Sequence, residues 1–271
     1  MISGLTPTPS SNLIVYKGVP YVVDAGYGAT FKLIQAGVPL HSLRYIFITH
    51  HHSDHNLDLG PMLYNAWASG LARPIAVFGP RGLNALIDGY WQSNRFDIDT
   101  RIVDEGRPDL RRLVHTHEFR EGLVFAQDGV KVTSLRVLHP PVTETYALRF
   151  ELGERVVVFS GDTAYFPPLA EFARNADYLV HEIVYPAALD ELLSNRPNVD
   201  RAKLKASILS HHTRPEDVGR IATNARAKAV VLSHFVPADD ERLTPAMWAR
   251  GVRSTYDGKV IVGRDLLALP L

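Results

Sequence analysis

Short apolar runs alternate with segments of helical periodicity along the first third of the chain. Leu13–Tyr16 and Tyr21–Val23 predict two strands joined by a Gly-Val-Pro turn. The apolar run Tyr45–Ile48 predicts a third strand, which stops at a cluster of histidines. The other elements predicted here are helices over Phe31–Ala36, Leu57–Ser69 and Leu83–Trp91 and a strand over Ile75–Phe78.

The middle of the chain is rich in strands, and the last third alternates helices and strands. Residues 94–112 carry mixed charges and little periodicity, which predicts a loop. The predicted strands are Leu113–Phe119, Leu123–Gln127, Val130–Leu138, Thr145–Glu151, Val156–Phe159, Tyr178–Val180, Ala229–Leu232 and Lys259–Val262. The predicted helices are Pro186–Ser194, Arg201–Leu209, Pro245–Val252 and one from Thr213 to about Ala227.

This order of elements predicts an α/β fold. The strand-rich centres are mostly antiparallel in pattern, and helices occur in both halves, which suits helices outside two packed sheets. We find no internal repeat, low-complexity segment or linker in the 271 residues. We therefore expect one domain over residues 1–271.

Composition narrows the classes of function. Lys plus Arg and Asp plus Glu both number 29, so the formal net charge of zero does not favour a nucleic-acid binder. The absence of cysteine excludes disulfides and thiolate ligands, whereas twelve histidines are present. No apolar run approaches the roughly 20 residues of a membrane span, and no secretory signal is readable at the start. We expect a soluble cytoplasmic protein.

Five ionisable residues fall within six positions directly after a predicted strand. Imidazole and carboxylate are ligands that suit zinc and related metals. On a tight loop, His50 and His52 can converge on one metal while Asp54 and His55 turn towards a second. His51 is then a spacer. A solvated histidine loop is the alternative, and the acidic partner and the preceding apolar strand argue against it.

The segment Thr49–His55 resembles the H-x-H-x-D-H signature of the metallo-β-lactamase superfamily. Later motifs occur in that family's order, each after a predicted strand: His139, Asp162 in Phe-Ser-Gly-Asp-Thr, and His234 in Leu-Ser-His-Phe. The resemblance covers nearly the whole chain. It implies a four-layer αβ/βα sandwich with a dinuclear metal site at one edge.

The resemblance also implies how the ligands divide between two metals. His139 matches the third ligand of the first metal, His234 the last ligand of the second, and Asp162 the aspartate that bridges both. Two Zn²⁺ are the first expectation, with Mn²⁺ or Fe²⁺ as alternatives. A di-iron redox role is disfavoured, because flavodiiron relatives place a carboxylate where this chain has His52.

Two further motifs resemble the ribonuclease Z-like and arylsulfatase-like branch. In Val180-His181-Glu182 and Ser210-His211-His212-Thr213, the resemblance assigns Glu182 to orient His211, which donates a proton to the leaving group. His212, or a capping role before Thr213, is the alternative to His211. The segment Gly4–Ser11 also resembles the end of that branch's glycine-rich loop.

These roles imply hydrolysis by a metal-bound hydroxide, because zinc lowers the pKa of bound water from 15.7 to about 7. The resemblance assigns Asp54 to bind metal and to help to orient the nucleophile. A proton donor suits a leaving alkoxide or phenoxide, which favours phosphodiester or related ester bonds. The remaining histidines have simpler interpretations: His41 lies in a loop, and His115 and His117 share a solvated strand face.

The substrate stays open between several classes. Ribonuclease Z has a glycine- and lysine-rich arm for tRNA, and residues 79–112, the one candidate, show no such stretch. We therefore expect a small-molecule ester substrate, with tRNA 3′-end processing as a minority hypothesis. Hydrolysis of an aryl sulfate, a carboxylic ester or a lactone stays open, as does a non-catalytic role as a metal-binding sensor. The resemblance also implies a homodimer.

Overall fold

The computed structural model describes residues 10–71, 73–194, 198–238, 240 and 242–271. The chain forms two compact units, which we call the N-terminal unit (Thr8–Arg120) and the C-terminal unit (Glu121–Leu271). Each is described by itself. Most of the predicted glycine-rich loop, Gly4–Ser11, lies outside the described residues. The prediction of one domain over residues 1–271 stays a prediction.

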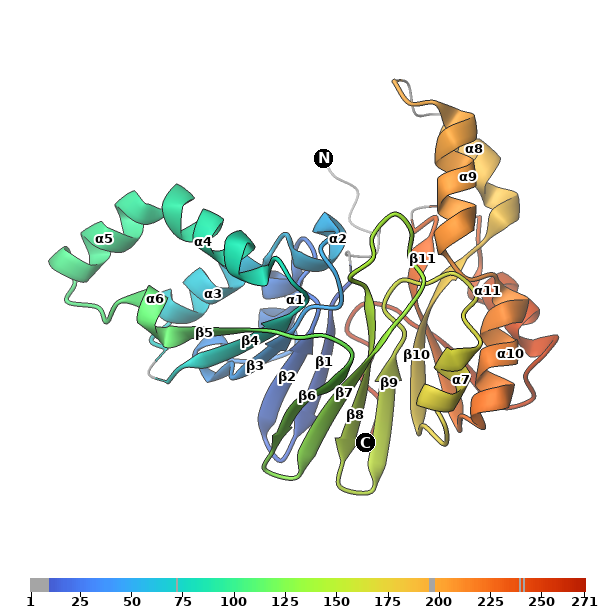
Figure 1. Ribbon diagram of the computed structural model, residues 1–271, viewed down its shortest axis with the longest axis horizontal. Helices are drawn as coiled ribbons and strands as arrows, with labels where there is room; N and C mark the ends of the chain where they lie inside the picture. Colours follow the sequence, from blue (N-terminus) through green and yellow to red (C-terminus); the bar gives the residue numbers. More distant parts are fainter. Residues whose placement is uncertain (1–9, 72, 195–197, 239, 241) are drawn as a thin grey trace. The chain divides into compact units, whose positions relative to one another are not determined.

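The N-terminal unit contains a five-stranded sheet in the order β1-β2-β3-β4-β5 (Figure 1). Its first two strands form an antiparallel hairpin, and the remaining neighbours pair in parallel. The strands are β1 (Asn12–Tyr16), β2 (Val19–Val23), β3 (Tyr45–Phe47), β4 (Ile75–Gly79) and β5 (Val114–Glu118). The helices are α1 (Ala29–Gln35), α2 (Ser53–Asn56), α3 (Leu59–Ala68), α4 (Leu83–Ser93), α5 (Arg95–Asp104) and α6 (Leu110–Leu113), with a 3₁₀ turn at Leu40–Ser42.

The core of the N-terminal unit lies between this sheet and its helices. Parallel strands buried on both faces carry continuous apolar runs, as Ile46 and Val77 illustrate. Helix α3 contributes Met62, Leu63 and Trp67, which are almost completely buried. The Trp67 indole N–H donates to the Pro108 carbonyl oxygen at 2.8 Å, which satisfies its polar group inside the core.

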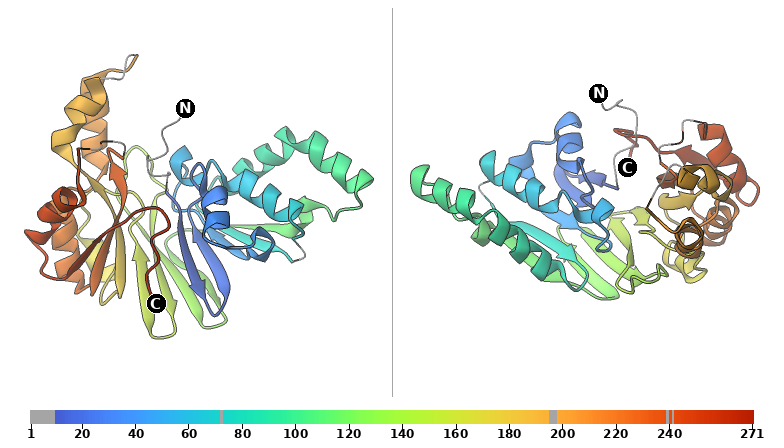
Figure 2. Two further views of the ribbon diagram at one scale, coloured as in Figure 1. Left: turned by 180° about the vertical axis from the view of Figure 1, so that it is seen from behind. Right: turned by 90° about the horizontal axis from the view of Figure 1, so that it is seen from above.

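The C-terminal unit contains a seven-stranded sheet in the order β12-β11-β10-β9-β8-β7-β6. Figure 2 shows the ribbon from behind and from above. Strands β6 to β9 pair antiparallel, whereas β9 to β12 pair in parallel. The strands are β6 (Gly122–Gln127), β7 (Val130–Arg136), β8 (Tyr146–Leu152), β9 (Arg155–Phe159), β10 (Tyr178–Val184), β11 (Ala229–Val236) and β12 (Lys259–Val262). The helices are α7 (Pro168–Phe172), α8 (Leu189–Ser194), α9 (Arg201–His211), α10 (Pro215–Ala225) and α11 (Pro245–Arg253), with a 3₁₀ turn at Pro186–Ala188.

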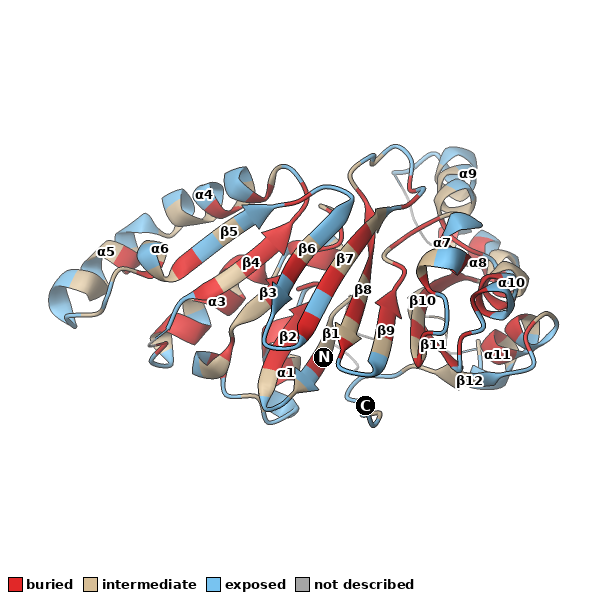
Figure 3. Ribbon diagram, turned by 60° about the horizontal axis from the view of Figure 1, so that its bottom comes forward, coloured by how far each residue is buried: buried red, intermediate tan, exposed pale blue. Residues whose placement is uncertain are grey.

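Helices α7, α10 and α11 pack beside the parallel half of this sheet. Val218 and Ile221 of α10 and Trp248 of α11 are buried in one apolar cluster with strand residues such as Val230. Figure 3 colours the residues by burial. The middle of each sheet is buried, whereas the residues of α9 are exposed or intermediate. Among the described residues, none of the helices is both long enough and apolar enough to cross a membrane.

Two predictions from the sequence are wrong in detail. Residues 94–112, predicted as a loop, contain α5 and α6. Their apolar periodicity is weak because α5 buries only Ile98, and ion pairs such as Arg101–Asp97 lie along the helix instead. The strand-rich centres are also less antiparallel than predicted, because β2 to β5 and β9 to β12 are parallel runs.

Candidate metal centre

The histidine run forms a loop and the short helix α2 immediately after β3 in the N-terminal unit. His50 and His55 are buried, and their ring centroids lie 4.1 Å apart. The Nε2 atom of His50 and the Nδ1 atom of His52 are separated by 3.1 Å. Two ring nitrogens that converge at this distance are placed to bind one small cation.

Asp24 holds this loop in place, although no sequence motif pointed to it. It follows β2, is buried, and has a positive φ of 63°. Its carboxylate accepts hydrogen bonds from the Thr49 amide at 2.8 Å, from the Thr49 hydroxyl at 3.0 Å and from His55 Nδ1 at 2.8 Å. With its proton on Nδ1, His55 carries its lone pair on Nε2, the form that binds a metal. The only sequence signal was an acidic residue at the end of an apolar strand.

The other two residues of the run point in different directions. His51 points to the turn between β4 and α4, where its Nε2 lies 3.3 Å from the Pro80 carbonyl oxygen. Its Nδ1 lies 3.2 Å from the Asn56 side-chain amide. Asp54 is about half exposed, and its Oδ2 lies 3.7 Å from His55 Nε2. The N-terminal unit therefore brings its candidate ligands together as two pairs, His50 with His52 and Asp54 with His55.

In the C-terminal unit, the three candidate ligands come from three different strands, and only two of them follow the strand end as the sequence predicted. His139 follows β7, Asp162 follows β9, and His234 lies within β11. The Asp162 carboxylate offers an oxygen within 4.8 Å of a ring nitrogen of His139 and an oxygen within 4.8 Å of a ring nitrogen of His234. Its Oδ2 is 3.3 Å from His234 Nε2. The Asp162 carboxylate thus lies near both histidines, as a ligand that bridges two metal ions must.

His139 is held in a form that can bind a metal. Its Nδ1 donates to the main-chain carbonyl oxygen of His211 at 3.0 Å, which leaves the lone pair on Nε2. Burial lowers the pKa of His139 to about 4, so the ring is neutral at pH 7. A neutral ring can donate its lone pair to a metal, whereas an imidazolium cannot.

Glu182 lies beside these ligands at an irregularity in β10. The register between β10 and β11 shifts between His181 and Ile183, and such bulges re-aim the side chain at the irregular position. Burial and the nearby charge of Asp162 raise the pKa of Glu182 well above its usual value. Its Oε1 accepts from the Thr213 amide at 2.7 Å.

The structure pairs Glu182 with His212, the residue that follows α9. The Nδ1 of His212 lies 3.2 Å from Glu182 Oε2, whereas the His211 ring lies beside His139, with centroids 4.6 Å apart. His211 ends α9 and His212 has an extended backbone, with φ −124° and ψ 155°. Adjacent side chains at such a junction point to different sides, which the sequence spacing does not specify.

The donor chemistry of both units fits divalent metal ions. The candidate ligands are neutral imidazoles and carboxylates, which suit zinc and related ions. Two of the imidazoles have their second nitrogen fixed, His55 by a carboxylate and His139 by a main-chain carbonyl. Such outer contacts orient metal-binding histidines.

Two other features do not join this constellation. The ring of His117 stacks on that of Phe78, with centroids 4.9 Å apart, and His115 is exposed.

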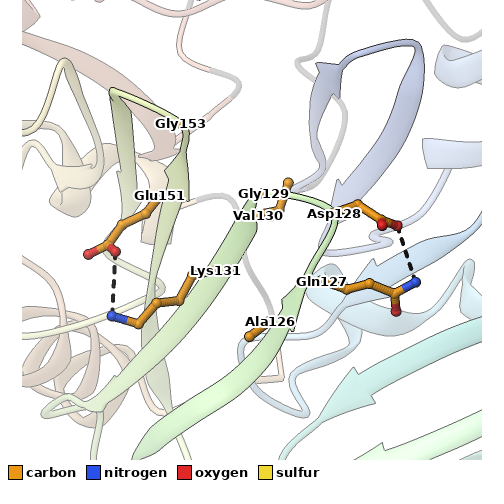
Figure 4. Close-up of a pocket in the computed structure, with 8 residues that line it drawn as sticks. All are labelled: Ala126, Gln127, Asp128, Gly129, Val130, Lys131, Glu151 and Gly153. Atoms are coloured by element: carbon orange, nitrogen blue, oxygen red, sulfur yellow. Dashed lines mark hydrogen bonds and ion pairs between the residues drawn. The ribbon is translucent and has the colours of Figure 1, made fainter.

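A cavity of about 370 Å³ lies at the turns between β6 and β7 and between β8 and β9 (Figure 4). Its polar side chains bond one another, Lys131 to Glu151 and Gln127 to Asp128. It lies at the opposite end of β7 from His139, roughly 20 Å along the strand.

Known proteins share this fold along nearly the whole chain. A Mycobacterium marinum protein named ribonuclease Z is 28% identical over 264 residues, which cover 94% of this chain and 90% of the relative. The crystal structure of human tRNase Z, short form (ELAC1), superimposes with a TM-score of 0.70 at 20% identity, covering 99% of this chain and 95% of that one. The metallo-beta-lactamase fold protein YhfI from Bacillus subtilis gives a TM-score of 0.68 at 22% identity, covering 95% and 90%.

These similarities confirm the predicted α/β metallo-β-lactamase fold and the ribonuclease Z-like resemblance. They also confirm the prediction of a metal-dependent hydrolase. Residues 8–219, most of the chain, match the family described as Anti-Pycsar protein Apyc1. The chain therefore belongs to the Anti-Pycsar protein Apyc1 family.

Proposed function

We propose that this protein hydrolyses phosphodiester bonds with two bound divalent metal ions. The observation that carries the proposal is the pairing of ligands within each unit, with Asp162 near both His139 and His234. In the arrangement that the superfamily resemblance implies, the first ion is bound by His50, His52 and His139, the second by Asp54, His55 and His234, and both by Asp162. Zinc is the first expectation, with manganese or iron as alternatives.

Bound metal ions would supply a water molecule of lowered pKa and neutralise charge on the phosphoryl oxygens. The protein's own groups then position the reactants. Asp54, half exposed beside His55, is placed to orient the attacking water. Asp24 and the His211 carbonyl keep the ligand rings in their binding orientation.

A proton donor is needed for the departing oxygen. We propose His212, because Glu182 holds its Nδ1 and would stabilise the doubly protonated ring, whose Nε2–H is the proton that can be donated. The family motif assigned this role to His211. His211 is the second candidate, because its ring lies beside His139.

For the substrate we propose a small-molecule phosphodiester. The support is electrostatic: phosphate contacts dominate nucleic-acid affinity, and the chain has a net charge of zero. In the segment 94–112, four arginines form ion pairs with carboxylates, so their charge is neutralised locally. Precursor tRNA is the second candidate, and the name ribonuclease Z of the curated relatives favours RNA over a small molecule.

Turnover of the metal-loaded protein tests these proposals. The panel is bis-(p-nitrophenyl) phosphate, 3′,5′-cyclic nucleotides and a precursor tRNA, beside an aryl sulfate, an aryl acetate, a lactone and a β-lactam. We expect chelator-sensitive cleavage of the small phosphodiesters. Selective tRNA cleavage would overturn the substrate class, and turnover of only another ester would overturn the reaction class. Stoichiometric metal with no turnover at all would favour a sensor.

We also propose a homodimer, which the resemblance implies. Support comes from α1 and its surroundings in the N-terminal unit, where Tyr27, Phe31, Ile34 and Leu57 are each more than half exposed. Exposed apolar clusters of this kind are typical of protein interfaces. Light scattering should give twice the chain mass, and Phe31→Ser should lower it. A monomeric wild type would contradict the proposal.

A further inference from the structure

A further group of candidate metal ligands lies entirely within the C-terminal unit. It consists of Glu182, His212 and His234, each of which offers one donor atom within 4.8 Å of the donor atoms of the other two. Glu182 and His212 do not belong to the ligand sets that the superfamily resemblance implies for the two proposed ions. Their convergence with His234 therefore forms a binding position that those two ions do not explain.

A bulge between strands β10 and β11 brings Glu182 next to His234. At the shift in register, the single residue Glu182 opposes two residues of β11, Ser233 and His234. His234 has a positive φ of 44°, which is uncommon for a residue other than glycine. Bulges of this kind re-aim a side chain relative to the regular ladder. The bulge thus accounts for the approach of a carboxylate and an imidazole from neighbouring strands.

His212 completes the group from the extended position that follows α9. Its Nδ1 lies 3.2 Å from Oε2 of Glu182. Its ring is nearly parallel to that of His234, with an interplanar angle of 24° and centroids 5.6 Å apart. Donor atoms around a tetrahedral zinc ion lie about 3.4 Å from one another, because each is about 2.1 Å from the metal. Glu182 and His212 already have nearly this spacing.

The chemistry and the burial of the group suit a zinc ion. One glutamate and two histidines are the protein ligands of some zinc enzymes, in which water completes the tetrahedron. Glu182 and His212 are buried, whereas the side chain of His234 is 14% exposed, which gives an ion access from that side. A cation would also neutralise the carboxylate of Glu182, whose burial disfavours an unpaired charge.

We propose that Glu182, His212 and His234 form an inhibitory site that binds a zinc ion when zinc is in excess. Glu182 otherwise holds His212, and His234 is a proposed ligand of the second ion. A neutral imidazole has a single lone pair, so His234 cannot serve both ions at once. The additional ion must displace these contacts, and it therefore binds more weakly than the first two.

Occupation of this site should stop proton donation. A zinc ion on Nδ1 of His212 takes the position of a proton, so the ring can no longer become doubly protonated. The doubly protonated ring is the proposed donor to the departing oxygen. The inhibition therefore rests on the proposed function, whereas the binding of the ion does not.

Zinc content measures the site without any turnover. The full chain is dialysed against low and then high free zinc, and the bound zinc is counted by atomic emission. We expect the wild type to gain one further ion per chain at high zinc. Glu182→Gln should not gain it, because an amide of nearly the same size is a weaker ligand, and neither should His212→Ala. Asp177→Asn should gain it and is the matched control, because Asp177 is a buried carboxylate that accepts from Lys228 and Arg155.

The outcomes distinguish this inference from the proposed function. No further ion in the wild type, or the same gain in both site variants as in Asp177→Asn, would overturn the inference even if phosphodiesters are hydrolysed. Excess zinc should also lower kcat for an alkyl phosphodiester about 100-fold, the scale of general acid catalysis. An unchanged kcat would overturn the inhibitory role. A further ion that depends on Glu182 and His212, without hydrolysis at either zinc concentration, would overturn only the proposed function.

Discussion

The N-terminal unit carries four candidate ligands within six residues of one loop, whereas the C-terminal unit gathers three from positions separated by up to 95 residues along the chain. The first set depends on one local conformation, which Asp24 fixes through Thr49 and His55. The second depends on the order of strands β7, β9 and β11 in a sheet. Ligands that are contiguous in the sequence can be recognised as a motif. Ligands that are far apart in the sequence come together only through the order of the strands in the folded sheet.

The two units also differ in what orients their histidines. His55 is held by the carboxylate of Asp24, a side chain that mutation can remove. His139 is held by the main-chain oxygen of His211. A substitution at position 211 retains this oxygen as long as the backbone conformation is unchanged. The ligands of the N-terminal unit should therefore be more sensitive to mutations outside the ligand set.

Removing one ligand from each unit should give the largest effect. We expect Asp162→Ala to abolish binding of both ions and all turnover, because its carboxylate is the proposed bridge. His52→Ala should leave about one ion per chain while abolishing turnover. Metal content by atomic emission, measured beside circular dichroism to confirm folding, distinguishes the two. Full metal content and turnover in either variant would contradict the ligand assignment.

The next largest effect is expected from removing the hydrogen bond that orients a ligand histidine. Asp24→Asn should weaken metal affinity about 10–100-fold, because it removes the charge that orients His55 while keeping the size of the side chain. Asp58→Asn is a matched control, since Asp58 accepts from the Thr30 amide instead of a ligand. Competition with a chromogenic chelator measures both. If the two variants lose affinity equally, Asp24 has no special role in orienting the ligand.

Variants of His211 and His212 distinguish a role in orienting a metal ligand from a role in proton transfer. His212→Ala should lower kcat by about 100-fold for an alkyl leaving group, and much less for p-nitrophenolate, which departs without a proton. His211→Ala should retain its metals, because the His139 contact uses the main chain. The ratio of the two rates in each variant is the readout. A leaving-group effect in His211→Ala alone would return the donor role to His211.

A smaller effect is expected away from the ligands. Burial raises the pKa of Asp177, but hydrogen bonds from Lys228, the Val156 amide and Arg155 outweigh it and hold the pKa below its usual range. The stabilisation is thus present above a pH of about 3.9 and is lost as the pH falls through the lowered value. Asp177→Asn should reduce the free energy of unfolding by about 1–3 kcal/mol at pH 7. Urea titration should show this difference shrinking in acid, with metal affinity unchanged throughout.

Sequence patterns predicted most of the strands because apolar runs bounded by turns are a strong local signal. Helix α5 was missed because its order comes from ion pairs such as Arg95–Asp99 and Arg101–Glu105, which apolar periodicity does not detect. Acidic and basic residues four apart were the available signal. The parallel pairing was also hidden, since it depends on contacts between distant segments.

At the candidate metal centre, sequence motifs suggested the ligands but not the residues that orient them. Asp24 lies 25 residues before Thr49, and its hydrogen bonds are created only by the parallel pairing of β2 with β3. The choice between His211 and His212 depends on the dihedral angles where α9 ends. Such supports are set by backbone geometry at single positions, which residue types and spacing leave undetermined.

The absence of buried residues in α9 has a consequence for evolution. A helix on which the core does not depend can accept substitutions with little loss of stability. Leu204 and Ile208 can therefore diverge while the ligand residues stay fixed. A library randomised at these two positions should meet few folding defects there. The fold thus leaves the sequence of α9 freer to change than the buried residues that support the proposed metal ligands.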